Sequence, residues 1–433
     1  MSKLKDYVMQ LAEDSVSMRG VLNLLPDPLI DDKSKSTNDI LSHLAYVFFE
    51  NTEIPLDLPI FTFLAYLSAG CVRNNLNYQI PKSPKIAHLN TWVCVLAPTG
   101  AAKTLSKTAI ASMIPDHPTE EGKFIDANFT SCSTSPKFIN ACASLPYVES
   151  DEYQYGLWIE EEAAQFQKLV NKGSSTNGAE IKGFILKMHN YEPLSRKTMT
   201  TETITAPIVM TMLHINTFDS YVSSLGRESV NDGSLRRMSL VNTPRDGRSF
   251  TDYPLFDFDS LMDESLKEKI SHLFLNLPSD SIFTFSEDCT KIYSDSFGGF
   301  WKKTYEHKLA GKENFYRTLF MEAWKYAIFH HLIMKQDGTI VSGNSLKWGI
   351  DVSVIFLDSL QSFINRKNNE KAFNKYDQDL EKLKDFLREK PKASAAAVVQ
   401  RFNFKLPYLH MLLDLLRKES QPINHPILKL GKR

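Results

Sequence analysis

The segment Thr91–Thr104, TWVCVLAPTGAAKT, decides the fold of this chain. Its first six residues are apolar or β-branched, which is typical of a short buried strand. A turn that contains Gly100 follows, and the next segment, Leu105–Met113, has the apolar spacing of a helix. A strand, a tight turn and a helix in this order predict one unit of an α/β fold with a parallel sheet.

The turn has the residue types of a Walker A loop, which binds the phosphates of a nucleotide. Such a loop directs backbone N–H groups around a phosphate, and a helix N-terminus lies behind it. We expect the ammonium of Lys103 to contact the β- and γ-phosphates of ATP and the hydroxyl of Thr104 to bind Mg²⁺. The expected nucleotide-binding residues are Ala97, Pro98, Thr99, Gly100, Ala101, Ala102, Lys103 and Thr104.

This loop departs from the usual glycine pattern. Ala97 and Ala102 occupy positions where glycine normally lets the chain approach the phosphates or adopt a positive φ. The two added methyl groups predict weaker nucleotide binding. The alternative interpretation is an ordinary strand–turn–helix with a chance lysine.

A second apolar strand ends in three glutamates, Glu160 to Glu162. A strand that ends in carboxylates is the Walker B arrangement, in which one carboxylate holds the magnesium shell and the next polarises the attacking water. We expect Glu161 on the metal side and Glu162 on the water side, with Glu160 as the alternative. We also expect this strand to be the neighbour of the strand before the loop. A solvated acidic run at the start of a helix is the alternative interpretation.

The next apolar strand, Ile208–Leu213, runs into a polar tip at Asn216. A polar residue at this place commonly contacts the γ-phosphate or the attacking water, so Asn216 is a candidate sensor; a turn asparagine is the alternative. The segment before it, Ser195–Ile204, is rich in β-branched residues and predicts a hairpin. Its Arg196 and Lys197 are candidate contacts to the phosphate backbone of DNA. The alternative is an exposed basic hairpin without a ligand.

Arg237 stands just before a fourth apolar strand and after an Asp-Gly turn. In many ring ATPases an arginine at such a place reaches the nucleotide of the neighbouring subunit and stabilises charge in the transition state. We expect Arg237 to be this finger, with Arg236 as the second choice. An arginine in a surface salt bridge is the alternative.

The organisation of the chain follows from these patterns. Strand and helix patterns alternate up to about residue 245, and after Pro254 helices dominate, among them Arg317–Met334 and Leu346–Ile364. We predict an N-terminal arm, a helical lead-in, a P-loop ATPase core, a helical domain and a C-terminal domain, at 1–33, 34–90, 91–250, 251–370 and 376–433. The charged stretch Asn365–Lys375 is expected to be a linker.

The C-terminal part, 376–433, carries 12 Lys and Arg against 7 Asp and Glu. Three helix patterns and a strand-like run follow one another in the order of a winged-helix domain, at Leu380–Arg388, Ala395–Phe402, Pro407–Lys418 and Ile427–Leu430. In the third helix four leucines form an expected core face: Leu409, Leu412, Leu413 and Leu416. Tyr408, His410, Arg417 and Lys418 remain outside it, and we expect Arg417 and Lys418 to contact duplex DNA. A small helical domain that packs on a partner is the alternative.

The bulk composition is that of an ordinary globular protein of 433 residues, with 42% apolar and 23% charged residues and a net charge of −1. No apolar run approaches 18 residues, so no membrane span is expected. Five cysteines stand far apart without any CxxC pair, which favours a reducing, cytoplasmic location and argues against a structural zinc site.

Four motifs occur in the order and spacing of one group of proteins: APTGAAKT, LWIEEEAAQF, SRKTMTTETITAPIVMTMLHIN and DGSLRRMSLV. Over roughly residues 50–365 the chain resembles the YfjI-like family of prophage, plasmid and satellite replication proteins. That family is similar to the ring-forming AAA+ helicases of the minichromosome-maintenance and superfamily-three types. The helical lead-in IPLDLPIFTFLAYLSAGCV and the later helix MEAWKYAIFHHLIM share in the resemblance.

The resemblance implies a homo-oligomeric ring, a hexamer in the first instance, that uses ATP and Mg²⁺ to unwind or remodel DNA. It gives nucleotide-site roles to Lys103, Thr104, Glu161, Glu162, Asn216 and Arg237, and it puts a second sensor at Lys325 or Arg317. Relatives often carry a primase module with zinc-binding cysteines, so here a separate primase or initiator protein would be needed. Two other functions remain open: a nucleotide-binding loader, adaptor or defence module with little turnover, and an ATPase that remodels proteins.

Overall fold

The computed structural model describes residues 24–25, 39–98, 100–118, 123–125, 129–170, 176–197, 202–224, 237–243, 261–306, 313–390, 393–404, 409–410, 412–413 and 416. The chain divides into two compact units, Met1–Ser362 and Phe363–Arg433. The first unit mixes helices with sheets that contain parallel strands, so the predicted α/β class is confirmed.

In the described part of the chain, six strands form the main sheet of the first unit. Their order is β4-β5-β7-β3-β8, and β6 pairs with β7 outside this path. The neighbours β5, β7, β3 and β8 run parallel, and the four buried strands predicted from the sequence are all present. The strands are β3 (Trp92–Leu96), β4 (Tyr147–Val148), β5 (Tyr153–Glu161), β6 (Pro193–Lys197), β7 (Glu202–Asn216) and β8 (Ser239–Asn242).

The order of the central strands corrects one prediction. We expected the acidic strand, β5, to be the neighbour of β3, and this is wrong because β7 lies between them. Leu96 of β3 pairs with Asn216, and Glu161 of β5 pairs with Ile215. The carboxyl-terminal half of β7 is buried along its whole length, which suits it to the central position, covered on both faces.

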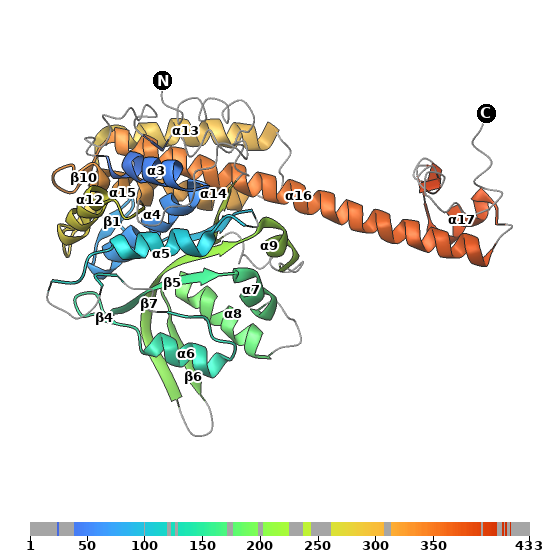
Figure 1. Cartoon of the computed structure of the whole chain (residues 1–433), viewed down its shortest axis with the longest axis horizontal. Coiled ribbons are helices and arrows are strands. Elements are labelled where there is room, and N and C mark those ends of the chain that lie inside the picture. Colours follow the sequence, from blue (N-terminus) through green and yellow to red (C-terminus); the bar gives the residue numbers. More distant parts are fainter. Residues whose placement is uncertain are drawn as a thin grey trace. The chain divides into compact units, whose positions relative to one another are not determined.

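Helices cover both faces of the main sheet (Figure 1). The hydroxyl of Ser68 in α4 lies 3.0 Å from the hydroxyl of Thr211 in β7, which fixes α4 on one face, and α5 packs beside α4. Helices α6, α7 and α8 contact β7 from the other face. No helix among the described residues is long and apolar enough to cross a membrane. The helices are α3 (Ile40–Asn51), α4 (Asp57–Arg73), α5 (Lys103–Met113), α6 (Ser135–Ala143), α7 (Ala163–Val170), α8 (Thr176–His189) and α9 (Phe218–Ser224).

A second, smaller sheet joins segments that are far apart in the sequence. Its order is β10-β9-β1-β2, so strands from the predicted lead-in pair with strands from the predicted helical domain. These strands are not predicted from the sequence, because each has only two to four residues. They are β1 (Asn77–Gln79), β2 (Ile86–His88), β9 (Ile282–Phe285) and β10 (Ile340–Val341).

The helices around the second sheet follow the sequence pattern with one difference. The predicted helix Arg317–Met334 is two helices, which meet at Glu322. The helices are α12 (Glu264–Leu275), α13 (Glu287–Glu306), α14 (Glu313–Met321) and α15 (Ala323–Ile333).

One long helix, α16 (Gly343–Glu389), begins in the first unit and ends in the second. The helices predicted at Leu346–Ile364 and Leu380–Arg388 are therefore one helix, and the stretch Asn365–Lys375, predicted as a linker, is helical. The stretch consists mainly of Asn and Lys and contains no Gly or Pro, so no residue in it breaks the helix.

The second unit has its own apolar core. Helix α17 (Ala395–Phe402) has the predicted bounds. The four leucines predicted as a core face are buried together with Leu383 and Leu387 of α16, while His410 is exposed. Tyr408, Arg417, Lys418 and the predicted strand Ile427–Leu430 lie outside the described residues.

Candidate functional site

The β3–α5 loop leaves the sheet at the carboxyl end of β3. Its first N–H, on Ala97, donates to the carbonyl of Asn216 at 2.8 Å, so the loop starts beside the end of β7. Gly100 has a φ of 86°, and no atom lies within 4 Å of the place where a side chain would begin. Ala102 has φ 44° and ψ 44°, the left-handed conformation that glycine normally provides. Ala97 does not have a positive φ, and Thr99 lies outside the described residues.

Helix α5 begins at Lys103 with an open N-terminus. Ala102 provides no capping side chain, and no acidic residue stands in the first turn. The first N–H groups of a helix lack partners within the helix and carry its partial positive charge. The ammonium of Lys103 lies 3.5 Å from the carbonyl of Pro98, so this side chain folds back over the loop. Hydrogen-bond donors and positive charge therefore gather at one point.

A carboxylate from β5 meets the start of α5. The hydroxyl of Thr104 donates to Oε2 of Glu161, and the ammonium of Lys107 lies 2.5 Å from Oε1 of the same carboxylate. Both donors belong to the first two turns of α5. The structure thus brings together Thr104 and Glu161, which are 57 residues apart and were both predicted as Mg²⁺ ligands.

These contacts keep Glu161 ionised. Partial burial raises the pKa of its carboxyl group, but hydrogen bonds from Lys107 and Thr104 and the charges of Lys107 and Lys103 outweigh it and hold the pKa below the ordinary value. An ionised carboxylate beside a hydroxyl is a donor set that Mg²⁺ accepts.

The other two glutamates of the acidic strand end have different surroundings. Glu160 accepts a hydrogen bond from the indole of Trp158 at 3.0 Å. Glu162 is exposed, has a φ of 57° and accepts from the amide of Gln165 at 2.6 Å. Glu161 is thus the glutamate that contacts α5, whereas Glu160 and Glu162 accept hydrogen bonds from Trp158 and Gln165.

Two buried polar atoms at the carboxyl edge of the sheet have no hydrogen-bond partner among the described residues. One is the amide nitrogen of Asn216, at the end of β7, and the other is the hydroxyl of Thr243, just after β8. The N–H of Thr243 donates to the carbonyl of Leu96 at 2.9 Å, which places Thr243 beside the start of the loop. Buried polar groups are rarely left unpaired, so both atoms indicate an absent acceptor, donor or water here.

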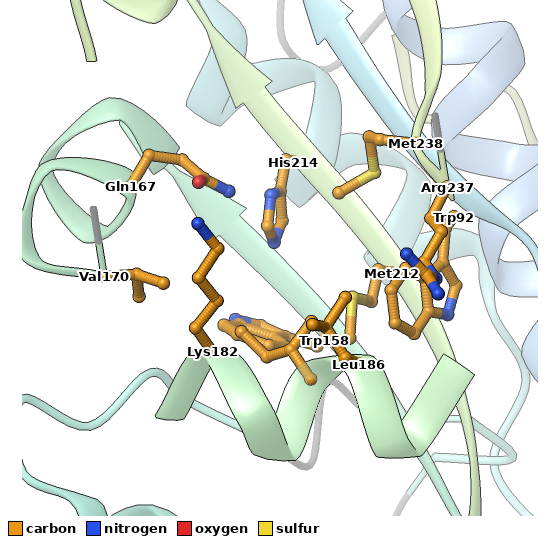
Figure 2. Close-up of a pocket in the computed structure, with 11 residues that line it drawn as sticks. Trp92, Trp158, Gln167, Val170, Lys182, Leu186, Met212, His214, Arg237 and Met238 are labelled. Atoms are coloured by element: carbon orange, nitrogen blue, oxygen red, sulfur yellow. The ribbon is translucent and has the colours of Figure 1, made fainter. Parts of the chain in front are cut away.

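Arg237 lies toward the opposite, amino edge of the sheet and lines a small pocket together with Trp92 and His214 (Figure 2). It precedes β8, whose first residue, Ser239, pairs with Val93 of β3. Four residues of strand, about 13 Å at ~3.3 Å per residue, separate Val93 from the start of the loop. Arg237 therefore does not serve the loop of its own chain, and a finger role requires a second subunit. Arg236 lies outside the described residues.

Lys325 does not take the expected position of a second sensor for its own loop. Its ammonium donates to the carbonyl of Asn90 at 2.9 Å and to the carboxylate of Glu322 at 3.0 Å. Asn90 precedes β3, so Lys325 lies at the amino edge, about 20 Å of strand from the loop. The prediction failed because helix spacing alone does not indicate which edge of the sheet a helix covers. Arg317, the second choice, is exposed on α14.

The predicted hairpin is present as β6 and the first half of β7, which pair antiparallel. Arg196 is held by Glu180 of α8, with 3.1 Å between its Nε and a carboxylate oxygen. Lys197 is 77% exposed and lies 3.5 Å from Glu202 across the hairpin. Lys197 is therefore the more accessible of the two predicted DNA contacts.

Two residues of this region were not found by sequence reasoning. Lys107 stands one helical turn after Lys103, which is a usable signal, but its contact with Glu161 depends on the position of β5. Thr243 follows an apolar strand as Asn216 does, so the same rule of a polar residue at a strand end could have identified it.

The chain matches no protein-family model, and no curated protein is significantly similar to it. The resemblance to the YfjI-like family therefore remains a prediction from the motifs.

Proposed function

We propose that this chain is a P-loop ATPase with an AAA+-like core that works on DNA. The observation that carries the proposal is the meeting of three strand ends at one edge of the sheet. The glycine-containing loop, the Glu161 carboxylate and the unpaired amide nitrogen of Asn216 come from β3, β5 and β7, with β7 in the middle. A ligand that offers phosphate oxygens and a divalent cation supplies the partners these groups lack.

ATP and Mg²⁺ fit the groups present. The open N-terminus of α5 and Lys103 would hold the phosphates, and Thr104 and Glu161 would hold the cation in place of their present mutual contact. Bound Mg²⁺ would neutralise charge on the β- and γ-phosphates. The amide of Asn216 would donate to a phosphate oxygen or orient the water, and Glu162, or Glu160, would accept the proton of that water.

The first test is nucleotide binding by Lys103→Ala. Removing the ammonium from a loop at the protein surface should weaken ATP binding by roughly a hundredfold or more while the melting temperature stays unchanged. Titration with a fluorescent ATP analogue and Mg²⁺ measures this. Lys137→Ala is the matched control, because Lys137 also stands in the first turn of a helix, α6, on the other face of the sheet. Equal affinity in Lys103→Ala and wild type would refute the nucleotide site.

DNA as the partner rests on the β6–β7 hairpin and the basic second unit. Lys197, near the tip of the hairpin, would contact a phosphate backbone, and the tail residues Arg417 and Lys418 would contact duplex DNA. Single-stranded DNA should stimulate ATP hydrolysis in wild type, and Lys197→Ala should reduce this stimulation without changing ATP affinity. Hydrolysis that is indifferent to DNA would favour an ATPase that remodels proteins.

A second function, a nucleotide-binding loader, adaptor or defence module with little turnover, is favoured by one observation. The methyl group of Ala102 sits on a left-handed backbone where glycine is usual. Binding of ATP without turnover, with or without DNA, would support this alternative, whereas DNA-stimulated turnover would support the helicase-type function.

A further inference from the structure

The Glu161 carboxylate at the end of β5 is held by two residues of α5. Its Oε1 lies 2.5 Å from the ammonium of Lys107, and its Oε2 accepts a hydrogen bond from the hydroxyl of Thr104. Residues three apart in a helix lie on the same face, so the two donors reach Glu161 from one side. Lys107 is thus the ion-pair partner of a proposed cation ligand.

This ion pair is partly open to solvent. The side chains of Lys107 and Glu161 are 29% and 25% exposed. The ammonium of a lysine stands on a flexible stem, so it can leave the carboxylate and turn into water without a movement of the backbone. An ion pair that solvent reaches has a small net stability. The pair can therefore open when another cation offers the carboxylate a stronger interaction.

The ammonium of Lys107 and a divalent cation compete for the same carboxylate. Mg²⁺ binds carboxylate and hydroxyl oxygens, and both carboxylate oxygens of Glu161 are already in contact with Lys107 and Thr104. A cation bound there beside the ammonium would lie close to a charge of the same sign, and the two would repel each other. The hydroxyl of Thr104 is neutral and is itself a ligand for the cation. Lys107 is therefore the group that must yield.

We propose that Lys107 is a positioning residue that holds Glu161 against α5 in the cation-free chain and competes with the divalent cation for this carboxylate. The inference rests on the proposed function, in which that cation is the Mg²⁺ bound with ATP. Lys107 neutralises Glu161, so the carboxylate attracts a bare cation only weakly before the nucleotide arrives. The phosphates of ATP add negative charge, which favours the doubly charged cation over the singly charged ammonium.

The direct test uses Mn²⁺ alone, without nucleotide, on the full chain. Mn²⁺ prefers the same oxygen ligands as Mg²⁺, and its binding lowers the electron paramagnetic resonance signal of the free ion. Lys107→Met removes the charge and nearly keeps the length of the side chain, so it should bind Mn²⁺ roughly tenfold more tightly than wild type. Adding Glu161→Gln should abolish this gain. Equal Mn²⁺ affinity in wild type and Lys107→Met would overturn the proposal.

Two control variants exclude other effects of the lost charge. Lys107→Arg keeps the positive charge and should keep the wild-type affinity for Mn²⁺. Lys137→Met removes an exposed positive charge from α6, on the other face of the sheet, and should also leave this affinity unchanged. A gain of the same size in Lys137→Met would indicate a general effect of net charge and would contradict the proposal.

A second measurement separates this inference from the proposed function. In binding of a fluorescent ATP analogue, the Mg²⁺ concentration at half-saturation should fall roughly tenfold in Lys107→Met. A lysine that serves only the stability of the fold would lower the melting temperature and leave this concentration unchanged. If wild type binds no nucleotide while Lys107→Met still gains Mn²⁺ affinity, the proposed function fails and the competition at Glu161 stands. If nucleotide binds with the same Mg²⁺ dependence in both proteins, the proposed role of Lys107 is refuted and the nucleotide site stands.

Discussion

The two edges of the parallel strands differ in how their charged groups are used. At the amino edge, Lys325 is mostly buried and paired: although burial lowers its pKa, the neighbouring Glu322 carboxylate raises the pKa above the ordinary value. At the carboxyl edge, the ammonium of Lys103 lies 3.5 Å from a carbonyl, and the amide nitrogen of Asn216 has no hydrogen-bond partner among the described residues. The carboxyl edge also holds two non-glycine residues with left-handed backbone, Ala102 and Glu162.

The difference indicates that the charge of Lys325 stabilises the fold, whereas the charge of Lys103 is placed where a ligand could use it. In parallel sheets the loops after the strands and the helix N-termini meet at the carboxyl edge, so ligands bind there. Lys325, at the amino edge, is instead neutralised by a carboxylate of its own chain, that of Glu322. Two lysines of the same chain therefore have opposite expected roles, and the following experiments test this contrast.

The largest effect is expected from Arg237, the amino-edge residue that the sequence predicts to be an arginine finger for a neighbouring subunit. Arg237→Ala should lower ATP turnover by ~10³-fold or more, because an arginine finger stabilises charge that develops only in the transition state. ATP binding should persist. Steady-state hydrolysis and equilibrium binding, measured on the same preparation, check both statements.

The matched experiment mixes the Arg237→Ala variant with the Glu162→Gln variant. Each variant supplies the group that the other lacks, so mixed assemblies should recover part of the activity. If no mixture recovers activity and the chain stays monomeric with ATP, the prediction that Arg237 is a finger for a neighbouring subunit is wrong.

Lys325→Met should act on stability. Removing one partner of a mostly buried ion pair leaves the Glu322 carboxylate without its counter-charge and should destabilise the fold by about 3–5 kcal/mol. Denaturant unfolding measures this. ATP affinity of the folded protein should not change. The double variant Lys325→Met with Glu322→Leu should regain much of the lost stability. A lower ATP affinity in either variant would contradict the inference that charge at the amino edge serves only the stability of the fold.

His214 should make stability depend on pH. Its pKa is about 4 in the folded chain and near 6.5 when unfolded, so between these values only the unfolded chain takes up the proton. Stability therefore falls as the pH falls from 6.5 to 4. Urea unfolding at a series of pH values should show a shallower fall in His214→Phe. His88 and His330, whose pKa values are also lowered to about 4, should maintain part of the slope.

The smallest effect is expected from Ala102→Gly. A left-handed alanine is strained by roughly 1–2 kcal/mol, and the greater entropy of unfolded glycine offsets part of the relief. The variant should therefore differ little in stability and bind ATP up to several-fold more tightly. Ala101→Gly is the control, since Ala101 does not have a positive φ. Tighter binding in both variants, or in neither, would show that strain at Ala102 does not limit nucleotide binding.

The sequence by itself determined the local elements of this protein. The apolar runs predicted β3, β5, β7 and β8, and the turn chemistry predicted a loop with a strained alanine. It also predicted the four core leucines of the second unit. These features depend on neighbours within a few residues, so periodicity and turn residues are enough to indicate them.

Only the tertiary structure decided which of these elements meet. The place of β7 between β3 and β5, the contact of Lys107 with Glu161 and the burial of Lys325 against Asn90 all join residues far apart in the chain. Strand order and side-chain neighbours follow from the packing of whole faces, which no local pattern encodes. For the same reason the cavity around His214, built from several strands and two helices, could not be seen in the sequence.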